Sequence, residues 1–117
     1  MKTDGCPVAR TLDLVGEWWT LLILRDALAG LKRFSEFQQS LGMAKNILSA
    51  RLRKLVDNGI LELRAASDGS AYQEYAITEK GRSLSGVVEA LREWGEKHLA
   101  DGDPPRRQKR AAKTLQT

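Results

Sequence analysis

Cysteine, histidine and proline are scarce in this chain of 117 residues, which contains one cysteine, one histidine and three prolines. A single cysteine cannot form an internal disulfide. The one histidine, His98, has no neighbouring cysteine or paired carboxylates at metal-ligand spacing. No glycine-rich phosphate loop follows a strand, and no general base or partner cysteine accompanies Cys6 as an enzyme nucleophile would require. We therefore expect no metal, no cofactor and no enzyme activity, with His98 as an ordinary packing or surface histidine.

Long apolar runs are also missing. The longest, from Trp18 to Leu24 with Thr20 inside it, is far too short to span a bilayer. The sequence shows no charged-then-apolar leader, and its single cysteine suits a reducing compartment. With 42% hydrophobic and 29% charged residues, the chain has the composition of a soluble globular domain. We expect a cytoplasmic protein without a membrane partner.

The charge is concentrated at the end of the chain. Residues 104–117, PPRRQKRAAKTLQT, hold five bases and no acid, with almost no apolar side chains to bury. We therefore expect one domain over residues 1–103 and a disordered basic tail over residues 104–117. The tail is either a non-specific solubility segment or an arm that follows phosphates.

The most informative stretch is residues 34–64, FSEFQQSLGMAKNILSARLRKLVDNGILELR. Its pattern predicts a short helix, a turn, a basic amphipathic helix that stops at Asn58-Gly59, and a strand. Leu48, Leu52 and Leu55 recur at i, i+4 and i+7, so they form one apolar stripe that would dock on the body of the domain. This order of elements is that of a winged helix-turn-helix.

The other faces of the second helix carry Lys45, Asn46, Ser49 and Arg53. Asn can pair in bidentate fashion with adenine, Lys and Arg with guanine or phosphate, and Ser with either. Residues 30–56 hold six bases and one acid, a local charge of +5, whereas the rest of residues 1–103 carries −6. The alternative is an ordinary amphipathic helix whose charges merely face water. Bases gathered on one side favour nucleic-acid binding instead.

Two helices are expected before this stretch. The first opens at Cys6-Pro7 and closes at Gly16, and the second, over residues 17–29, is apolar around most of its circumference and ends at Gly30. Such a helix is expected to be buried at the centre of the fold. Trp18 and Trp19 are expected to be core residues rather than an aromatic ligand box.

A hairpin and a last helix are expected after it. The strand from Ile60 reverses at the turn of residues 67–70 and returns from Tyr72 to Ile77, forming a wing. Thr78 is the expected N-cap of a last helix that runs through LSGVVEALREWGEKHL. This helix carries an apolar stripe made of Leu84, Val87, Val88, Leu91, Trp94 and His98. Such a stripe packs on the first helix or on a second subunit, and we expect a homodimer, since duplex sites are usually read as two half-sites.

Several motifs together resemble the HxlR-type transcriptional regulators, small bacterial winged-helix proteins related to the MarR regulators: C-P-V near the start, LDLVGEWWTLLILRDALAG, RFSEFQQSLGMAKNILSARLRKLVDNGIL and EYAITEKG. The match covers most of residues 6–95. It implies a mainly α fold with a small β-hairpin wing (α+β), whose first and last helices build the dimer interface. The helix from Lys45 to Val56 would enter the major groove, and the wing would touch the flanking minor groove.

The resemblance also directs attention to Cys6, because some members carry a cysteine near the start of the first helix that senses electrophiles or oxidants. Physically, a helix N-terminus favours the reactive thiolate, whereas Asp4 opposes ionisation and a lone cysteine is more often a buried small hydrophobe. The chain departs from the common wing pattern, in which a Pro and an Arg precede the Glu-Tyr pair. Here those places hold Ser70 or Ala71 and Tyr72.

From these features we expect a DNA-binding transcriptional regulator, in the first instance a repressor, that acts as a homodimer on a promoter operator. A response to electrophiles, oxidants or a small-molecule effector is left open. The alternative is a non-specific architectural DNA-binding protein. The residues expected to contact DNA are Lys32, Arg33, Ser35, Lys45, Asn46, Ser49, Ala50, Arg53 and Tyr72. The residues expected at the dimer interface are Val8, Leu12, Val87, Leu91 and Trp94.

Overall fold

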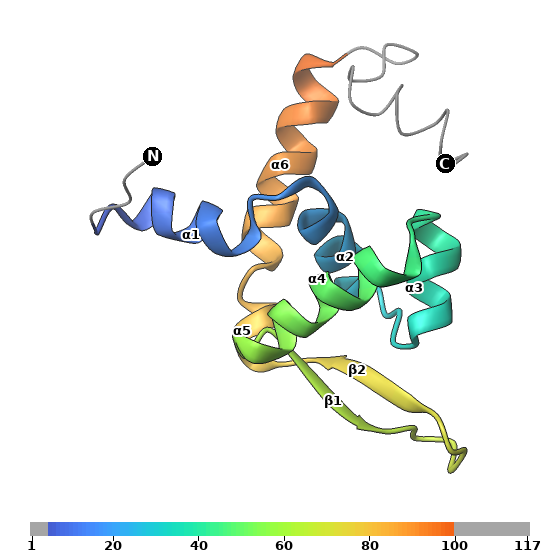
Figure 1. The fold of residues 1–117 in the computed structure, drawn as a ribbon. Coiled ribbons are helices and arrows are strands. Elements are labelled where there is room, and N and C mark those ends of the chain that lie inside the picture. Colours follow the sequence, from blue (N-terminus) through green and yellow to red (C-terminus); the bar gives the residue numbers. More distant parts are fainter. Residues whose placement is uncertain (1–4, 100–117) are drawn as a thin grey trace.

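The computed structural model describes residues 5–99, which form six helices and one two-stranded antiparallel sheet (Figure 1). In chain order the elements are α1 (Pro7–Val15), α2 (Trp18–Leu28), α3 (Phe34–Leu41), α4 (Lys45–Asp57), β1 (Leu61–Ala65), β2 (Gln73–Ile77), α5 (Glu79–Arg82) and α6 (Ser85–His98). The expected fold, mainly α with a hairpin wing, is confirmed. The boundary expected at residue 103 and the tail expected over residues 104–117 lie outside the described residues.

Helix α2 supplies the centre of the core, as its apolar composition predicts. Ile23, Leu24 and Ala27 are buried there and join side chains from α3, α4 and β1 in one cluster. Trp19 is half-buried and packs against this cluster. Trp18 is also half-buried and meets Trp19 edge to face, with ring centroids 6.4 Å apart. The core therefore closes on one side of α2, and the two indoles lie at its margin rather than inside it.

Helices α3 and α4 form the helix-turn-helix. Glu36 starts α3 by accepting hydrogen bonds from the backbone N–H groups of Lys32 and Arg33, at 2.8 and 3.0 Å, which satisfies donors that a helix start leaves unpaired. The turn between the helices needs a left-handed residue, and Gly42 supplies it with φ 67°. The leucine stripe of α4 is completely buried, so the rotation of α4 about its axis is fixed by packing.

The wing is the hairpin of β1 and β2, in which Leu61 pairs with Ile77 and Ala65 with Gln73. Gly69, with φ 80°, allows the reversal between the strands. A further hydrogen bond, from the backbone N–H of Tyr75 to the carbonyl of Lys32 at 2.7 Å, joins β2 to the loop before α3. The wing is thus attached to the helix-turn-helix by backbone contacts as well as by chain connectivity.

The sequence predicts one continuous last helix after Thr78. The structure instead divides this segment into two helices. Thr78 is the N-cap, with its hydroxyl accepting from the N–H of Gly81 at 3.0 Å, but α5 ends at Arg82 and α6 begins at Ser85. The N–H of Leu84 bonds the carbonyl of Gly81 three residues back at 3.0 Å, so the chain tightens into a turn between the helices. Helix α6 then leaves the body, and α1 extends away from it on another side (Figure 1).

Candidate nucleic-acid interface

The exposed side of α4 is opposite its buried leucines. Asn46, Ala50 and Arg53 recur at i, i+4 and i+7, and all three are exposed, as are Lys45 and Ser49. The structure therefore places the five α4 residues expected to contact DNA on the solvent side of one well-anchored helix. A helix of this kind can enter the major groove with amide, hydroxyl and guanidinium groups directed at base edges and phosphates.

Arg33 and Tyr72, expected separately as DNA contacts, lie together where the wing meets α3. The Arg33 guanidinium stands 5.3 Å from the centroid of the Tyr72 ring and forms a 2.5 Å ion pair with Asp68 in the wing turn. Hydrogen bonds from the backbone and side chain of Ser70, followed by the one from Arg33, lower the pKa of Asp68. Asp68 therefore stays ionised and holds Arg33 against the wing.

Lys32 and Ser35 flank this wing contact. Both are exposed, Lys32 in the loop before α3 and Ser35 in its first turn. Asp68 lies in the turn predicted for residues 67–70, but its ion pair with Arg33 was not among the predicted contacts. The signal was present, because an Asp followed by Gly in a hairpin turn commonly accepts a hydrogen bond two residues on, here from the N–H of Ser70 at 2.9 Å.

The positive charge of α4 is smaller on its exposed outer side than the sequence count suggests. The Arg51 Nε donates to Glu17 Oε1 at 3.0 Å, and the Lys54 ammonium donates to the backbone carbonyl of Asp13 at 3.0 Å. Both bases are therefore directed toward the junction of α1 and α2. Of the six bases counted over residues 30–56, these two bind the domain's own helices instead of facing solvent freely.

Glu17 has a structural role that the sequence pattern did not predict. Its carboxylate caps α2 by accepting from the backbone N–H of Thr20 at 3.0 Å, and it also pairs with Arg51. Burial alone would raise the pKa of Glu17, but the hydrogen bonds from Arg51 and from the Thr20 and Trp19 backbone outweigh it and hold this pKa below its ordinary value. The pair fixes the start of α2 against α4.

The apolar residues expected at a dimer interface are exposed in the single chain. They are Val8 and Leu12 on α1, and Val87, Leu91 and Trp94 on α6. The described part of α6 contains no buried residue, and its stripe packs against the core at the half-buried Val88 and Leu84. His98 stacks near Trp94, with ring centroids 4.8 Å apart. Helices α1 and α6 thus each leave apolar side chains largely exposed in the single chain.

Cys6 is the N-cap residue of α1 and is exposed. Its carbonyl accepts from the N–H of Arg10 at 2.9 Å, while its side chain makes no capping hydrogen bond. The alternative that this cysteine is a buried small hydrophobe is therefore wrong. Asp4, expected to oppose ionisation of the thiol, lies outside the described residues.

Between residues 5 and 99 no group of three or more His, Cys, Asp or Glu side chains could hold a metal ion. Over the same range no helix is both long and apolar enough to cross a membrane.

Comparison with known proteins places the chain among transcriptional regulators. The family model described as HxlR-like helix-turn-helix matches residues 14–103. An HTH-type transcriptional regulator of Mycobacterium tuberculosis is 41% identical over 104 residues, which cover 89% of this chain and 66% of that relative, just under two thirds of its length. The crystal structure of PA1607, named as a transcription factor, is 51% identical with a TM-score of 0.79, over 90% of this chain and 73% of that one.

The redox regulator HypR is also similar in fold. In its reduced form it is 34% identical to this chain with a TM-score of 0.71, over 78% of this chain and 91% of HypR. In its oxidised form it is 33% identical with a TM-score of 0.72, over 81% and 99% respectively.

Proposed function

The chain belongs to the HxlR-like helix-turn-helix family of transcriptional regulators, and from this premise we propose that it is a homodimeric, sequence-specific DNA-binding repressor. The observation that carries the proposal is the division of α4 into a completely buried leucine stripe and an opposite side formed by Asn46, Ala50 and Arg53. Packing holds the helix rigidly while its polar side chains stay free for the major groove. Regulation of transcription would follow from occupancy of a promoter operator.

The wing is proposed to act beside α4. Arg33 already lies against Tyr72 with its charge balanced by Asp68. A DNA phosphate can replace the Asp68 carboxylate, because both are anions that accept from a guanidinium. Lys32 and Ser35 are exposed at the same end of α3 and would add backbone contacts. In this proposal the wing supplies positioning, and α4 supplies base readout.

The dimer is proposed to bury Val8 and Leu12 of α1 and Val87, Leu91 and Trp94 of α6 against the same residues of a second copy. A two-fold interface uses the same patch on both subunits. Exposed apolar side chains on two helices are the kind of surface that such an interface covers. Two recognition helices would then stand at a fixed separation, as a site with two half-sites requires.

The experiment starts with selection of bound duplexes from a random library, followed by fluorescence anisotropy on the selected duplex and on a scrambled one over a salt series. A sequence-specific regulator retains a large affinity ratio between the two, whereas an architectural protein binds both alike. Arg53→Ala and Lys45→Ala should each weaken the complex. Loss of a base contact should cost about 1–3 kcal/mol of binding free energy on the selected site, whereas loss of a phosphate contact should lower the slope of log affinity against log salt concentration by about one.

The matched control is Lys97→Ala, which removes an exposed base at the far end of α6. It should leave affinity and salt slope unchanged. Equal binding of selected and scrambled duplexes by the native protein would favour the architectural alternative. Unchanged affinity in both α4 variants would show that DNA contacts a different surface.

A redox response at Cys6 is proposed as a second layer of control. The thiol is exposed at the start of α1, the helix assigned here to the dimer, and the similar protein HypR is known in reduced and oxidised forms. With one cysteine in the chain, oxidation can give only a mixed adduct, a sulfenic acid or a bridge between the Cys6 residues of two subunits. Diamide should weaken operator binding by the native protein and leave Cys6→Ser unaffected. Equal responses of the two proteins would make Cys6 a structural residue.

A further inference from the structure

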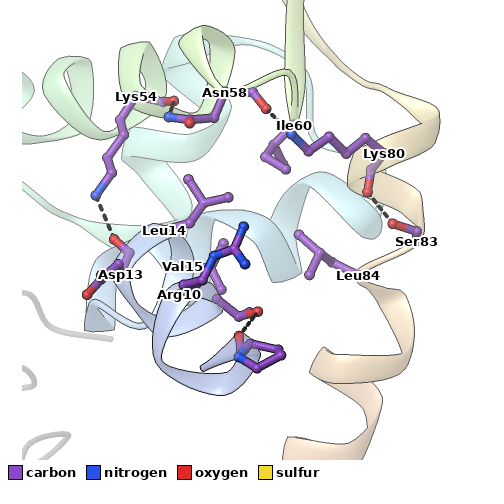
Figure 2. Close-up of a pocket in the computed structure, with 12 residues that line it drawn as sticks. Arg10, Asp13, Leu14, Val15, Lys54, Asn58, Ile60, Lys80, Ser83 and Leu84 are labelled. Carbon is purple, nitrogen blue, oxygen red and sulfur yellow. Dashed lines mark hydrogen bonds between the residues drawn. The ribbon is translucent and has the colours of Figure 1, made fainter. Parts of the chain in front are cut away.

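A cavity lies at the junction of α1 with the carboxyl end of α4 and with α5 (Figure 2). Its volume is 660 Å³, and it is open to solvent. Cavities that bind small organic molecules have volumes of about 300–1,000 Å³. None of the residues assigned above to DNA contact or to the dimer lines it.

Three cations surround this cavity. Lys54 and Lys80 each donate to a backbone carbonyl, that of Asp13 at 3.0 Å and that of Asn58 at 2.9 Å. An ammonium has three donors, so each lysine keeps two for a further partner. Arg10 makes no side-chain hydrogen bond or ion pair with any described residue, and Figure 2 shows it directed from α1 into the space between Leu14 and Leu84.

The charges at the cavity do not cancel. Among residues 5–99, Asp13 is the one carboxylate in the lining, against Arg10, Lys54 and Lys80, so in this part of the chain the positive charges exceed the negative by two. Neither lysine is neutralised by its carbonyl partner, because a carbonyl is a dipole without net charge. An anion entering the cavity would therefore find unpaired donors and a favourable potential.

The walls between these cations are apolar. Leu14 and Val15 contribute from α1, Ile60 from the start of the wing and Leu84 from the turn before α6. Val15 and Ile60 are buried and lie beneath the cavity floor, so the accessible apolar wall consists of the half-buried Leu14 and Leu84. A small inorganic anion would satisfy the charges and leave these walls wet. An organic anion with an aromatic or similarly bulky apolar body would satisfy both.

We infer that this cavity binds an amphipathic organic anion, specifically an aromatic carboxylate, as an effector. The inference rests on the proposed function, because it assigns the site at which the regulator's DNA binding is controlled. The carboxylate is held by Arg10, Lys54 and Lys80, and the ring lies on Leu14 and Leu84.

The position of the cavity gives the ligand a route to the DNA-binding surface. Lys54 belongs to α4, and its hydrogen bond to Asp13 is a direct link between α4 and α1. A carboxylate that takes Lys54 away from that carbonyl frees α1 to change its angle to α4. On α1 the cavity side holds Pro7, Thr11 and Leu14, whereas Val8 and Leu12 lie on the adjacent side, so ligand and partner subunit can be bound together.

The experiment is isothermal titration calorimetry of the full chain with 1-naphthoate. Two further ligands isolate the parts of the inference: 1-naphthalenemethanol, which has the rings without the charge, and inorganic phosphate, which has charge without the rings. Arg10→Gln and Lys80→Gln remove one cation each, and Thr11→Phe fills the cavity from an exposed position. Lys97→Gln, at the far end of α6, is the matched control.

The native protein should bind 1-naphthoate more tightly than either other ligand. Each Gln variant should lose about tenfold in affinity, as expected for one charge-assisted hydrogen bond in a solvated site. Thr11→Phe should abolish binding, and Lys97→Gln should bind as the native protein does. Absence of naphthoate binding, equal binding of the alcohol or of phosphate, or unchanged affinity in all three cavity variants would overturn the inference.

Operator affinity is then measured with and without saturating 1-naphthoate. The ligand should weaken binding to two half-sites in the native protein and have no effect on Thr11→Phe. Unaltered operator binding by a protein shown to hold the ligand would overturn the role as effector. A protein that binds 1-naphthoate but no selected duplex would instead refute the proposed function, while one that binds the duplex but not 1-naphthoate would refute only the cavity.

Discussion

The exposed leucine and tryptophan of α6 provide the sharpest test of the proposed dimer. Leu91 and Trp94 leave 53% and 60% of their surfaces accessible in the single chain. Full burial of a leucine side chain stabilises by about 1.5–3 kcal/mol, and roughly half of Leu91 is already covered. Covering the rest is therefore worth about 1 kcal/mol for each subunit and about 2 kcal/mol for a two-fold dimer.

Leu91→Arg removes this contribution and places two unpaired guanidinium groups in the same buried patch. Leaving an unpaired charge in an interface costs several kcal/mol, so the dimer dissociation constant should rise by about a hundredfold or more. Sedimentation velocity over a concentration series measures the change. Circular dichroism should show the native helix content, because Leu91 packs on none of the buried core.

Glu93→Arg is the matched control, because it introduces the same side chain two residues away. Two residues correspond to about 200° around a helix, so residue 93 lies on the side opposite Leu91. This variant should dimerise like the native protein. If Leu91→Arg associates as tightly as Glu93→Arg while both are folded, the interface does not include this side of α6 and the reasoning is refuted.

Three other changes test the fold and the tail. In Gly81→Ala the new Cβ would stand 2.4 Å from the Ile60 carbonyl oxygen, so the free energy of unfolding in urea should fall by about 1–3 kcal/mol. In Gly86→Ala nothing lies within 4 Å of the new Cβ, so the free energy of unfolding should not fall. Equal stability of the Gly81→Ala and Gly86→Ala variants would mean that α5 shifts freely. The pKa of Glu17 is lowered below its ordinary value in the folded protein, so the stability from this carboxylate is present above the ordinary pKa of a glutamate and lost as the pH falls through the lowered pKa. Glu17→Gln should therefore be less stable near neutral pH and less sensitive to acid in unfolding experiments at several pH values, and an unchanged acid profile would contradict this. Removal of residues 104–117 should lower affinity for scrambled duplex and leave the melting temperature unchanged, whereas a lower melting temperature would show that the tail packs.

The helix-turn-helix and the wing could be predicted from the sequence because each depends on local patterns. The spacing of Leu48, Leu52 and Leu55 fixes which side of α4 is buried, and this alone places Asn46 and Arg53 in solvent. The turn of the wing follows from Gly69, whose φ of 80° is costly for other residues. In such cases the period of the side chains or one special residue decides the structure.

The break between α5 and α6 could not be predicted in this way. Every residue from Glu79 to His98 except the glycines is compatible with a continuous helix, and Thr78 is a proper N-cap. Gly81 is buried directly against the carbonyl of Ile60, a contact between segments that the helical pattern does not encode. Tertiary packing at this position therefore sets where the turn occurs.

The sides of α4 on which its basic side chains lie are a second feature that was not predicted, although their spacing in the sequence contained part of the answer. A count over residues 30–56 treats Arg51 and Arg53 as equivalent. Two residues apart on a helix, they lie on nearly opposite sides, and only Arg53 shares the side of Asn46 and Ala50. What the spacing could not supply was the partner of Arg51, because Glu17 lies 34 residues away in the chain.

These partners give α4 a structural role besides its proposed contact with DNA. Arg51 holds the start of α2, Lys54 holds the end of α1, and the buried leucines hold the core, so α4 cannot turn without moving all three. In a dimer joined through α1 and α6, the separation of the two α4 helices would therefore depend on the angle at which α1 leaves the body. The Lys54 to Asp13 hydrogen bond is one of the contacts that hold α1 against α4, and it lies in a solvent-open cavity, where one exposed contact can be exchanged at small energetic cost. Control of DNA binding would then require no change in the core, only a change of partner for one lysine.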